Sequence, residues 1–297
     1  MNVRIAAVQM RAEPGQKPAN LAKAKRFVTH AASEGARVAL LPELFNVGYY
    51  IGPRLFEWWE PEDGRTVTWM RDEASALGIT LGGTIAERRG NRLYNTMFLA
   101  EPDGSLHKYA KRQPTKNEVP AFDAGDDPSI VQTSLGRVGV VVCADMTWGA
   151  SLLRPLAGAV DLLLVPQASN APRWQGRAVW RLEAKMKRPM FAGHVRCIGA
   201  PAAIAGLIGP MQRVTRLFGN YLYGGTWIMT ADGHPLANVP FDDEGVAIGD
   251  VTLGAVSNRA PASLLRDPGF GRGVLDALVI EPPNMRRSRD TATTLIP

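Results

Sequence analysis

The stretch VVVCADMTW, residues 140–148, leads a run of valines directly into one of the two cysteines of the chain. Continuous apolar runs of this kind indicate strands that are covered on both faces or packed sheet against sheet. Cys143 would then be either a small buried hydrophobic residue that ends the strand, or a nucleophile held at its end. These residues alone leave both interpretations open.

The sequence around this stretch alternates between strand patterns and helix patterns. Strands are expected at residues 3–10, 38–43, 79–86, 93–101, 138–143 and 160–166. Helices are expected at residues 18–34, 65–77, 149–158 and 176–189, and Gly35 supplies a stop for the first of them. This order of elements predicts an α/β fold.

Two further segments each contain a strand pattern, an Asp-Gly turn and a second strand pattern. They are NTMFLAEPDGSLHKY at 95–109 and GTWIMTADGHPLANV at 225–239. Asp-Gly between apolar runs is a strong hairpin signal. A hairpin in each half of the chain suggests a duplicated ββ unit and two sheets, although Asp-Gly turns are common enough for chance to be the alternative.

Composition places the chain among ordinary globular proteins. It has 297 residues, a net charge of +6 and no Pro/Ser-rich linker, so one large domain is expected. Lys and Arg are spread along the chain, with a minor run at Arg286–Arg289, which predicts a solvated basic surface and no nucleic-acid partner. A preference for anionic small substrates is the alternative interpretation of this charge.

The N-terminal sequence and the cysteine content bear on location. MNVRIAAVQM lacks the pattern of a signal peptide, and no apolar segment approaches the roughly 20 residues that span a bilayer. Two cysteines in a chain of this length are not a disulfide framework. We therefore expect a cytoplasmic protein without a membrane partner, in which the thiols stay free.

Three residues that could carry chemistry end or closely follow apolar strands. Glu43 closes VALLPE, Lys111 follows LHKY, and Cys143 closes VGVVVC. In α/β folds the ends of strands hold reactive side chains rigidly while one side stays open. Taken singly, each residue also has a structural interpretation, as a helix cap, a solvated charge or a core thiol.

A reactive cysteine needs a base beside it and donors for a developing oxyanion. None of the four histidines lies in a recognisable Cys–His motif. A partly desolvated glutamate can serve as the base instead, because burial raises its pKa. Glu43, Lys111 and Cys143 together would supply base, oxyanion donor and nucleophile.

Three segments, in this order, resemble the signature segments of the nitrilase or carbon–nitrogen hydrolase superfamily. They are LLPELF at 40–45, HKYAKRQP at 107–114 and VGVVVCADMTW at 138–148. The similarity extends over nearly the whole chain. It implies a nitrilase-like four-layer α-β-β-α sandwich in a single domain, residues 1–281, with a C-terminal tail at 282–297.

The resemblance also implies roles for individual residues. Glu43 matches the general base of the family, Lys111 its catalytic lysine and Cys143 its nucleophile. Within NEVPAFDAGDD, residues 117–127, Glu118 matches a second glutamate, structural or catalytic. The implied reaction is acyl transfer through a cysteine thioester, with Lys111 and the backbone N–H of Ala144 holding the oxyanion. No metal or cofactor is expected.

The pocket can be outlined only by position in the sequence. Trp148 closely follows the nucleophile, and Asn170, Arg173 and Trp174 lie in a segment that resembles the substrate region of amidohydrolase relatives. An arginine there could pair a substrate carboxylate, although a solvated loop arginine is an equal interpretation. Cys197, in an apolar strand-like stretch, is expected to be a packed thiol.

The chain departs from the family pattern at several positions, which are Gln113, Met146, Thr147, Gly149 and Arg196. The Ala144–Asp145 pair favours an amidase or N-carbamoyl hydrolase over a nitrilase, since true nitrilases usually have Trp and then Glu after the nucleophile. A nitrilase, an acyltransferase or a non-catalytic member of the same fold are the alternatives. The resemblance also implies a small-molecule substrate and a homodimer or higher homo-oligomer.

Overall fold

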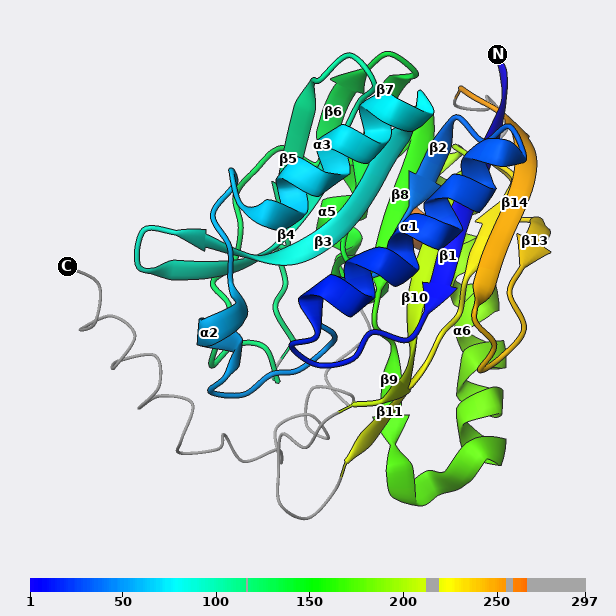
Figure 1. The fold of residues 1–297 in the computed structure, drawn as a ribbon. Coiled ribbons are helices and arrows are strands. Elements are labelled where there is room, and N and C mark those ends of the chain that lie inside the picture. Colours follow the sequence, from blue (N-terminus) through cyan, green and yellow to red (C-terminus); the bar gives the residue numbers. More distant parts are fainter. Residues whose placement is uncertain (116, 212–218, 255–258, 266–297) are drawn as a thin grey trace.

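The strands form one continuous hydrogen-bonded path that folds back so that its two halves face each other (Figure 1). The computed structural model describes residues 1–115, 117–211, 219–254 and 259–265. Along the main path the strand order is β5-β4-β3-β2-β1-β10-β8-β7-β6. The strands of this path are β1 (Asn2–Met10), β2 (Val38–Leu40), β3 (Thr80–Arg89), β4 (Arg92–Ala100), β5 (Leu106–Ala110), β6 (Ile130–Thr133), β7 (Gly136–Val140), β8 (Leu162–Gln167) and β10 (Ala202–Pro210).

The two halves join at β1. This strand pairs in parallel with β2 over residues 5–7 and with β10 only at residues 9–10. Its pairing with β14 is antiparallel along most of its length. The remaining strands are β9 (Asn170–Pro172), β11 (Asn220–Tyr223), β12 (Trp227–Met229), β13 (Pro235–Asn238) and β14 (Gly245–Thr252).

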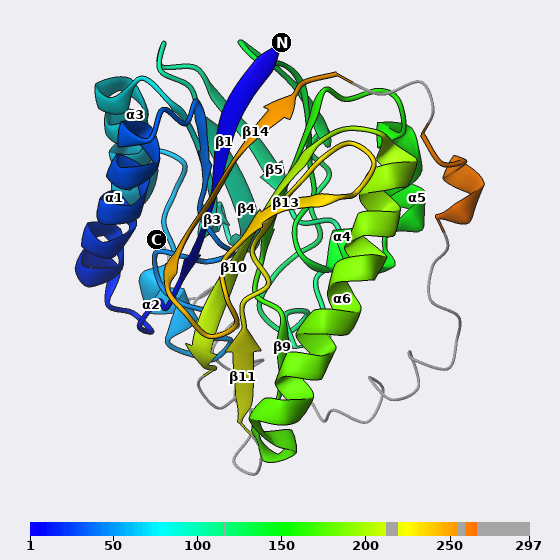
Figure 2. The same ribbon diagram turned by 90° about the vertical axis from the view of Figure 1, so that its right-hand side faces the viewer.

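Helices cover the two outer faces of this double sheet, so the layers run α-β-β-α (Figure 2). On one side lie α1 (Lys17–Ser33) and α3 (Arg65–Leu77), and on the other lies α6 (Gly176–Ile198), with α5 (Ala150–Leu153) near one end of it. Short helices complete the chain at α2 (Leu55–Trp58), α4 (Ala144–Trp148), η1 (Arg154–Leu156), η2 (Arg173–Gln175) and η3 (Ala262–Leu264).

The alternation of side chains along each strand explains why the fold has an α-β-β-α layer order. Side chains on a strand point to opposite faces in turn. In β1, Ile5 and Ala7 enter the central cluster between the two sheet halves, whereas Ala6 and Val8 face the cluster beneath α1 and α3. On the other half, Leu164 enters the same central cluster while its neighbours in β8 face α6. Continuous apolar runs are therefore required, because both faces of these strands are covered.

The predicted α/β sandwich is confirmed. Both predicted Asp-Gly hairpins are also confirmed: they are the antiparallel pairs β4–β5 and β12–β13. The strand predicted at 138–143 ends earlier, at Val140. Backbone hydrogen bonds to β8 continue as far as the Cys143 N–H, but a φ of 49° at Cys143 turns the chain out of the sheet. The predicted tail at 282–297 lies outside the described residues.

Helix α6 differs most from expectation. It continues nine residues beyond the predicted end at residue 189, through Pro189, to Ile198. Its second half buries Phe191, Val195 and Ile198 against the sheet, and this packing outweighs the hydrogen bond that proline removes. The strand-like stretch around Cys197 is therefore helical, which corrects that expectation, while the thiol itself is buried as predicted.

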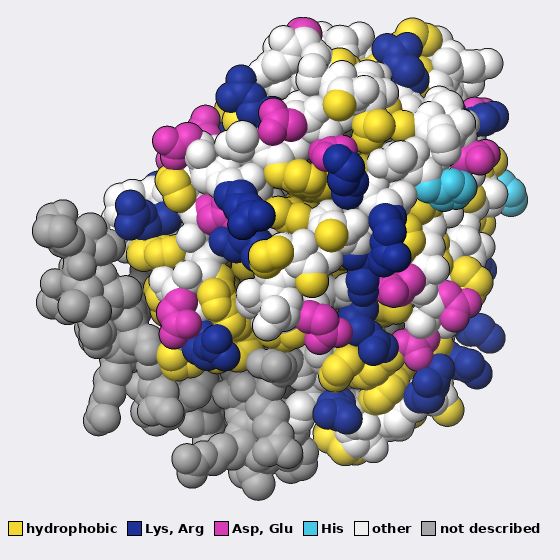
Figure 3. All heavy atoms as spheres, viewed as in Figure 1, with side chains coloured by type: hydrophobic (Ala, Val, Ile, Leu, Met, Phe, Trp, Pro, Cys, Tyr) yellow, Lys and Arg dark blue, Asp and Glu magenta, His cyan; other side chains and the backbone are white. Residues whose placement is uncertain are grey.

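Charged side chains of both signs are interspersed with apolar ones over the face shown in Figure 3. Among the helices of the described residues, none combines the length and the apolar character needed to cross a membrane.

We predict that Gly125→Ala distorts the segment that carries Lys111. The N–H of Gly125 donates to the Lys111 carbonyl, and an added Cβ would meet the Ala110 carbonyl oxygen at 2.3 Å. Overpacking of this kind costs about 1–3 kcal/mol of unfolding free energy, which urea denaturation would measure. Gly193→Ala, in open space within α6, is the control, with a gain of up to about 1 kcal/mol. Equal effects of the two changes would contradict the prediction.

Candidate active site

Four predicted residues converge where strands of the two sheet halves end. Glu43 follows β2, Lys111 directly follows β5, and Cys143 lies three residues beyond β7. Glu118 lies in a turn that Thr115 opens, and the backbone N–H of Thr115 donates to Glu118 Oε2 at 2.7 Å. Strand ends from both halves of the sandwich therefore fix the site from opposite sides.

Lys111 is held between two carboxylates. Its Nζ lies 2.8 Å from Glu43 Oε1 and 2.7 Å from Glu118 Oε2. All three side chains are 0% exposed. A buried charge is stable only when it is paired and hydrogen-bonded, so the three residues depend on one another.

Asn95, in β4, connects the two carboxylates. Its side-chain N–H groups donate to Glu43 Oε1 at 2.8 Å and to Glu118 Oε1 at 3.1 Å. Its backbone carbonyl also accepts the N–H of Lys111 at 2.9 Å. Asn95 is therefore the positioning residue of the cluster. Sequence reasoning missed it, because it sits inside an apolar strand rather than at the end of one.

The two carboxyl groups differ in their pKa. Burial raises the pKa of Glu43 above its usual value, and the Lys111 charge only partly opposes this. Burial acts on Glu118 as well, but the Lys111 charge and several hydrogen bonds bring the pKa of Glu118 below its usual value. Such a split assigns different roles to two neighbouring acids. The lowered pKa keeps Glu118 ionised beside Lys111, whereas the raised pKa makes Glu43 the easier of the two to protonate.

Cys143 is the member of this group that reaches an open space. Its side chain is 8% exposed and its thiol is free. Its φ of 49° lies in the left-handed region that non-glycine residues avoid, and such strain is concentrated at functional sites. Burial, together with the charge of Glu43, raises the pKa of Cys143 to about 12, so the resting sulfur is a thiol. It needs a base in order to react.

Asp145 ties the loop of Cys143 to the loop of Lys111. Its carboxylate accepts hydrogen bonds from the Tyr109 hydroxyl at 3.0 Å and from the Gln113 N–H at 2.8 Å. It also accepts the Val142 N–H at 3.2 Å. One buried carboxylate thus connects β5, the turn after Lys111 and the loop of Cys143, which fixes the position of the thiol relative to the ammonium.

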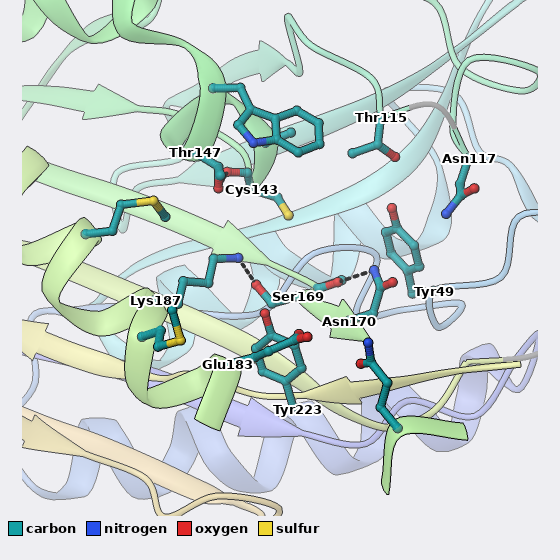
Figure 4. A pocket seen from close by; sticks show the side chains of 16 residues that line it. Tyr49, Thr115, Asn117, Cys143, Thr147, Ser169, Asn170, Glu183, Lys187 and Tyr223 are labelled. Atoms are coloured by element: carbon teal, nitrogen blue, oxygen red, sulfur yellow. Dashed lines mark hydrogen bonds between the residues drawn. The ribbon is translucent and has the colours of Figure 1, made fainter. Parts of the chain in front are cut away.

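A cavity of about 600 Å³ opens over Cys143 (Figure 4). Glu43, Lys111 and Glu118 do not line it and lie below its surface. The wall residues come from the loops after β2, β5, β7 and β8, and from α4, β9, η2, α6 and β11. They are Tyr49, Thr115, Asn117, Cys143, Ala144, Thr147, Trp148, Ala168, Ser169, Asn170, Gln175, Glu183, Met186, Lys187, Met190 and Tyr223.

The structure sorts the four pocket residues that the sequence suggested. Trp148 and Asn170 line the cavity. Within the described part of the chain, the indole N–H of Trp148 is buried and has no hydrogen-bond partner. Arg173 and Trp174 lie in η2 and are not among the lining residues, and Trp174 is 71% exposed.

Helix α6 contributes a wall that sequence reasoning missed. Glu183, Met186, Lys187 and Met190 all line the cavity. Their spacing of three and four residues places them on one face of a helix. That spacing was visible in the sequence, but only the fold shows that this face lies across from Cys143. No group of three or more His, Cys, Asp or Glu side chains within the described ranges is arranged to hold a metal ion.

Comparison with known proteins gives a consistent result. Residues 4–260 match the family model described as carbon-nitrogen hydrolase. The chain is 34% identical over 171 residues to a chloroplastic omega-amidase of Arabidopsis thaliana, covering 52% of this chain and 46% of that protein. It is 32% identical over 168 residues to a nitrilase of Pyrococcus abyssi, covering 55% of this chain and 64% of that protein. The alignments thus span about half to two thirds of these relatives.

Solved structures show the same fold. A carbon-nitrogen hydrolase from Helicobacter pylori superposes with a TM-score of 0.77 at 19% identity, over 84% of this chain and 89% of that one. An amidase from Nesterenkonia sp. superposes with a TM-score of 0.68 at 23% identity, over 93% and 96% of the two chains.

Proposed function

Because the chain belongs to the carbon–nitrogen hydrolase family, we propose that it hydrolyses a small amide or N-carbamoyl compound through a thioester on Cys143. The observation that carries this proposal is the buried Glu43–Lys111–Glu118 cluster next to a strained, cavity-lining thiol. These groups supply a base, a cation and a nucleophile, which acyl transfer requires.

In the first step Glu43 takes the proton of the Cys143 thiol as the sulfur attacks the carbonyl carbon. A raised pKa makes Glu43 a better base than an ordinary carboxylate, and the thiol, with its own raised pKa, stays neutral until substrate arrives. The carbonyl π electrons move to oxygen. Lys111 and the Ala144 N–H stabilise this oxyanion, with Glu118 keeping Lys111 charged.

Collapse of the tetrahedral intermediate breaks the carbon–nitrogen bond. Glu43 returns the proton to the leaving nitrogen, so ammonia or an amine departs and the acyl group remains on sulfur. Water then attacks the thioester while Glu43 takes one of its protons. The carbon–sulfur bond breaks, the carboxylic acid leaves, and the proton returns to Cys143. The cycle uses one water and leaves every protein group as it began.

Amides are favoured over nitriles by two observations. The nucleophile is followed by Ala144 and Asp145, and Asp145 is engaged in holding the Lys111 turn. The relatives named above include an omega-amidase and an amidase, and a third relative is named a nitrilase. The test of the proposed function therefore includes nitriles as a second class of substrate.

We expect ammonia release from short aliphatic amides or N-carbamoyl amino acids, and little or none from the corresponding nitriles. Replacing the nucleophile in Cys143→Ala should lower turnover by a factor of about 1,000 or more. Cys197→Ala, which removes the other buried thiol of the chain, should keep turnover near that of the wild type. Unchanged turnover of every substrate in Cys143→Ala would overturn the proposal.

The pH dependence tests the assignment of Glu43. Activity requires its ionised form, so kcat/KM should be present at neutral pH and fall as the pH drops through its pKa. Since burial raises that pKa, the acid limb should lie above pH 4.5, the ordinary value for glutamate. A profile that stays flat to pH 4.5 or below would show that Glu43 is not the proton acceptor.

A further inference from the structure

The backbone bends sharply directly after Glu43. Leu44 has a φ of 51°, in the left-handed region that residues other than glycine avoid. Among the non-glycine residues that the structure describes, only Cys143 and Asp242 also have a positive φ. The proposed base and the proposed nucleophile therefore both stand at a strained turn. Such a turn persists only where its surroundings hold it in place.

A threonine of β3 holds the turn at Leu44. The backbone N–H of Leu44 donates to the Thr84 hydroxyl oxygen at 2.8 Å. Both residues are 0% exposed, so bulk solvent cannot supply another acceptor. Without the hydroxyl, this N–H would be a buried donor with no partner, which destabilises the conformation that buries it. The left-handed turn therefore depends on the Thr84 side chain.

The glycine beside Thr84 lets the Glu43 segment lie directly against β3. A Cβ added at Gly83 would meet the ring of Phe45 at 2.9 Å and the Cβ of Leu41 at 3.0 Å. The N–H of Leu41 also donates to a β3 carbonyl oxygen at 2.7 Å. Hydrogen bonds to β3 thus hold the segment on both sides of Glu43, and the bond to Thr84 is the one that follows the glutamate.

The position of this segment determines what the Glu43 carboxylate can reach. Its Oε1 accepts hydrogen bonds from Lys111 Nζ and from the Asn95 side chain, each at 2.8 Å. Its Oε2 is buried and has no hydrogen-bond partner within the described residues. Under the proposed function, Oε2 is therefore the oxygen left to take the proton of Cys143. A shift of the backbone at Glu43 would change the path of that proton.

We propose that Thr84 is a second positioning residue of the site, whose hydroxyl holds the strained turn at Leu44. The turn in its place keeps the Glu43 carboxylate within reach of the Cys143 thiol. This inference rests on the proposed function. Asn95 holds the carboxylate itself, whereas Thr84 holds the backbone that carries it. Thr84 does not line the cavity, so it acts on the reaction through Glu43.

Thr84→Val tests this assignment, because it removes the hydroxyl and keeps the shape of the side chain. A misplaced base transfers protons poorly, so kcat for a short amide should fall about 10- to 100-fold. KM should change little, since the cavity wall stays intact. Thr84→Ser keeps the hydroxyl and should retain most of the activity. Thr84→Ala removes the same acceptor with less bulk, and it gives the same comparison if the valine variant does not fold.

Thr133→Val is the matched control. The Thr133 hydroxyl also accepts a backbone N–H, that of Leu135 at 3.1 Å, in the turn between β6 and β7 and outside the cavity lining. This change should lower the midpoint of urea denaturation about as much as Thr84→Val does, and it should leave kcat near the wild-type value. Equal losses of kcat in the two valine variants would overturn the inference, because lost stability would explain both. A loss in Thr84→Ser as large as in Thr84→Val would also overturn it.

Alkylation of Cys143 by iodoacetamide separates this inference from the proposed function, because it needs the thiol and its base but no hydrolysis. The sulfur displaces iodide, and the thiol proton passes to Glu43. The rate would be followed by intact mass, with peptide mapping to distinguish Cys197. It should fall about 10-fold in Thr84→Val and stay at the wild-type value in Thr133→Val.

The two measurements together assign any failure. Slower alkylation in Thr84→Val, with no amide turned over by the wild type, would contradict the proposed function alone. Amide turnover by the wild type, with equal alkylation rates in the wild type and Thr84→Val, would contradict the inference alone.

Discussion

The buried ion cluster of Lys111 with Glu43 and Glu118 is the constraint on which the site depends. Three charged groups without solvent contact are tolerated only in fixed geometry, because loss of any partner leaves an uncompensated charge in the interior. Asn95 holds both carboxylates, and the backbone around Lys111 is bonded to Asn95 on one side and to Gly125 on the other. The ion pairs and hydrogen bonds of the cluster offset the cost of burying these charges, and under the proposed function Glu43 is the member that moves a proton.

The sandwich makes that rigidity possible and also positions Cys143, the proposed nucleophile. Lys111 and Glu43 come from the end of one sheet half, and Cys143 comes from the other. Asp145 bridges the two through hydrogen bonds to Tyr109, Gln113 and Val142. The left-handed backbone at Cys143 turns the sulfur out of the apolar layer and into the cavity while its N–H stays bonded to β8. Strain at this one residue is the local consequence of placing a reactive group at the end of a buried strand.

Much of the fold and three of the site residues could be predicted from the sequence, because those residues lie where an apolar strand pattern ends. Apolar runs located the strands, and Glu43, Lys111 and Cys143 stand at or after their ends. Their roles, and the choice of Glu118, came only from the resemblance to the carbon–nitrogen hydrolase family. Asn95 could not be found this way, since it interrupts a strand without ending it, and Lys187 could not, since a lysine on an amphipathic helix looks like a solvated charge. Arg173 and Trp174 were suggested because their segment resembles the substrate region of amidohydrolase relatives, and the fold places them outside the cavity lining. Homo-oligomerisation and a cytoplasmic location stay predictions.

The most direct test of the account is the mass of the protein during turnover. Wild-type protein and Glu43→Gln would each be mixed with an amide substrate, quenched in acid and measured intact, and the adduct would then be located by peptide mapping. The account predicts a mass increase equal to the acyl group, carried by Cys143 in the wild type, and a slower or absent increase in Glu43→Gln, which lacks the base for both acylation and hydrolysis. Ammonia release without any adduct, or with an adduct on another residue, would contradict it.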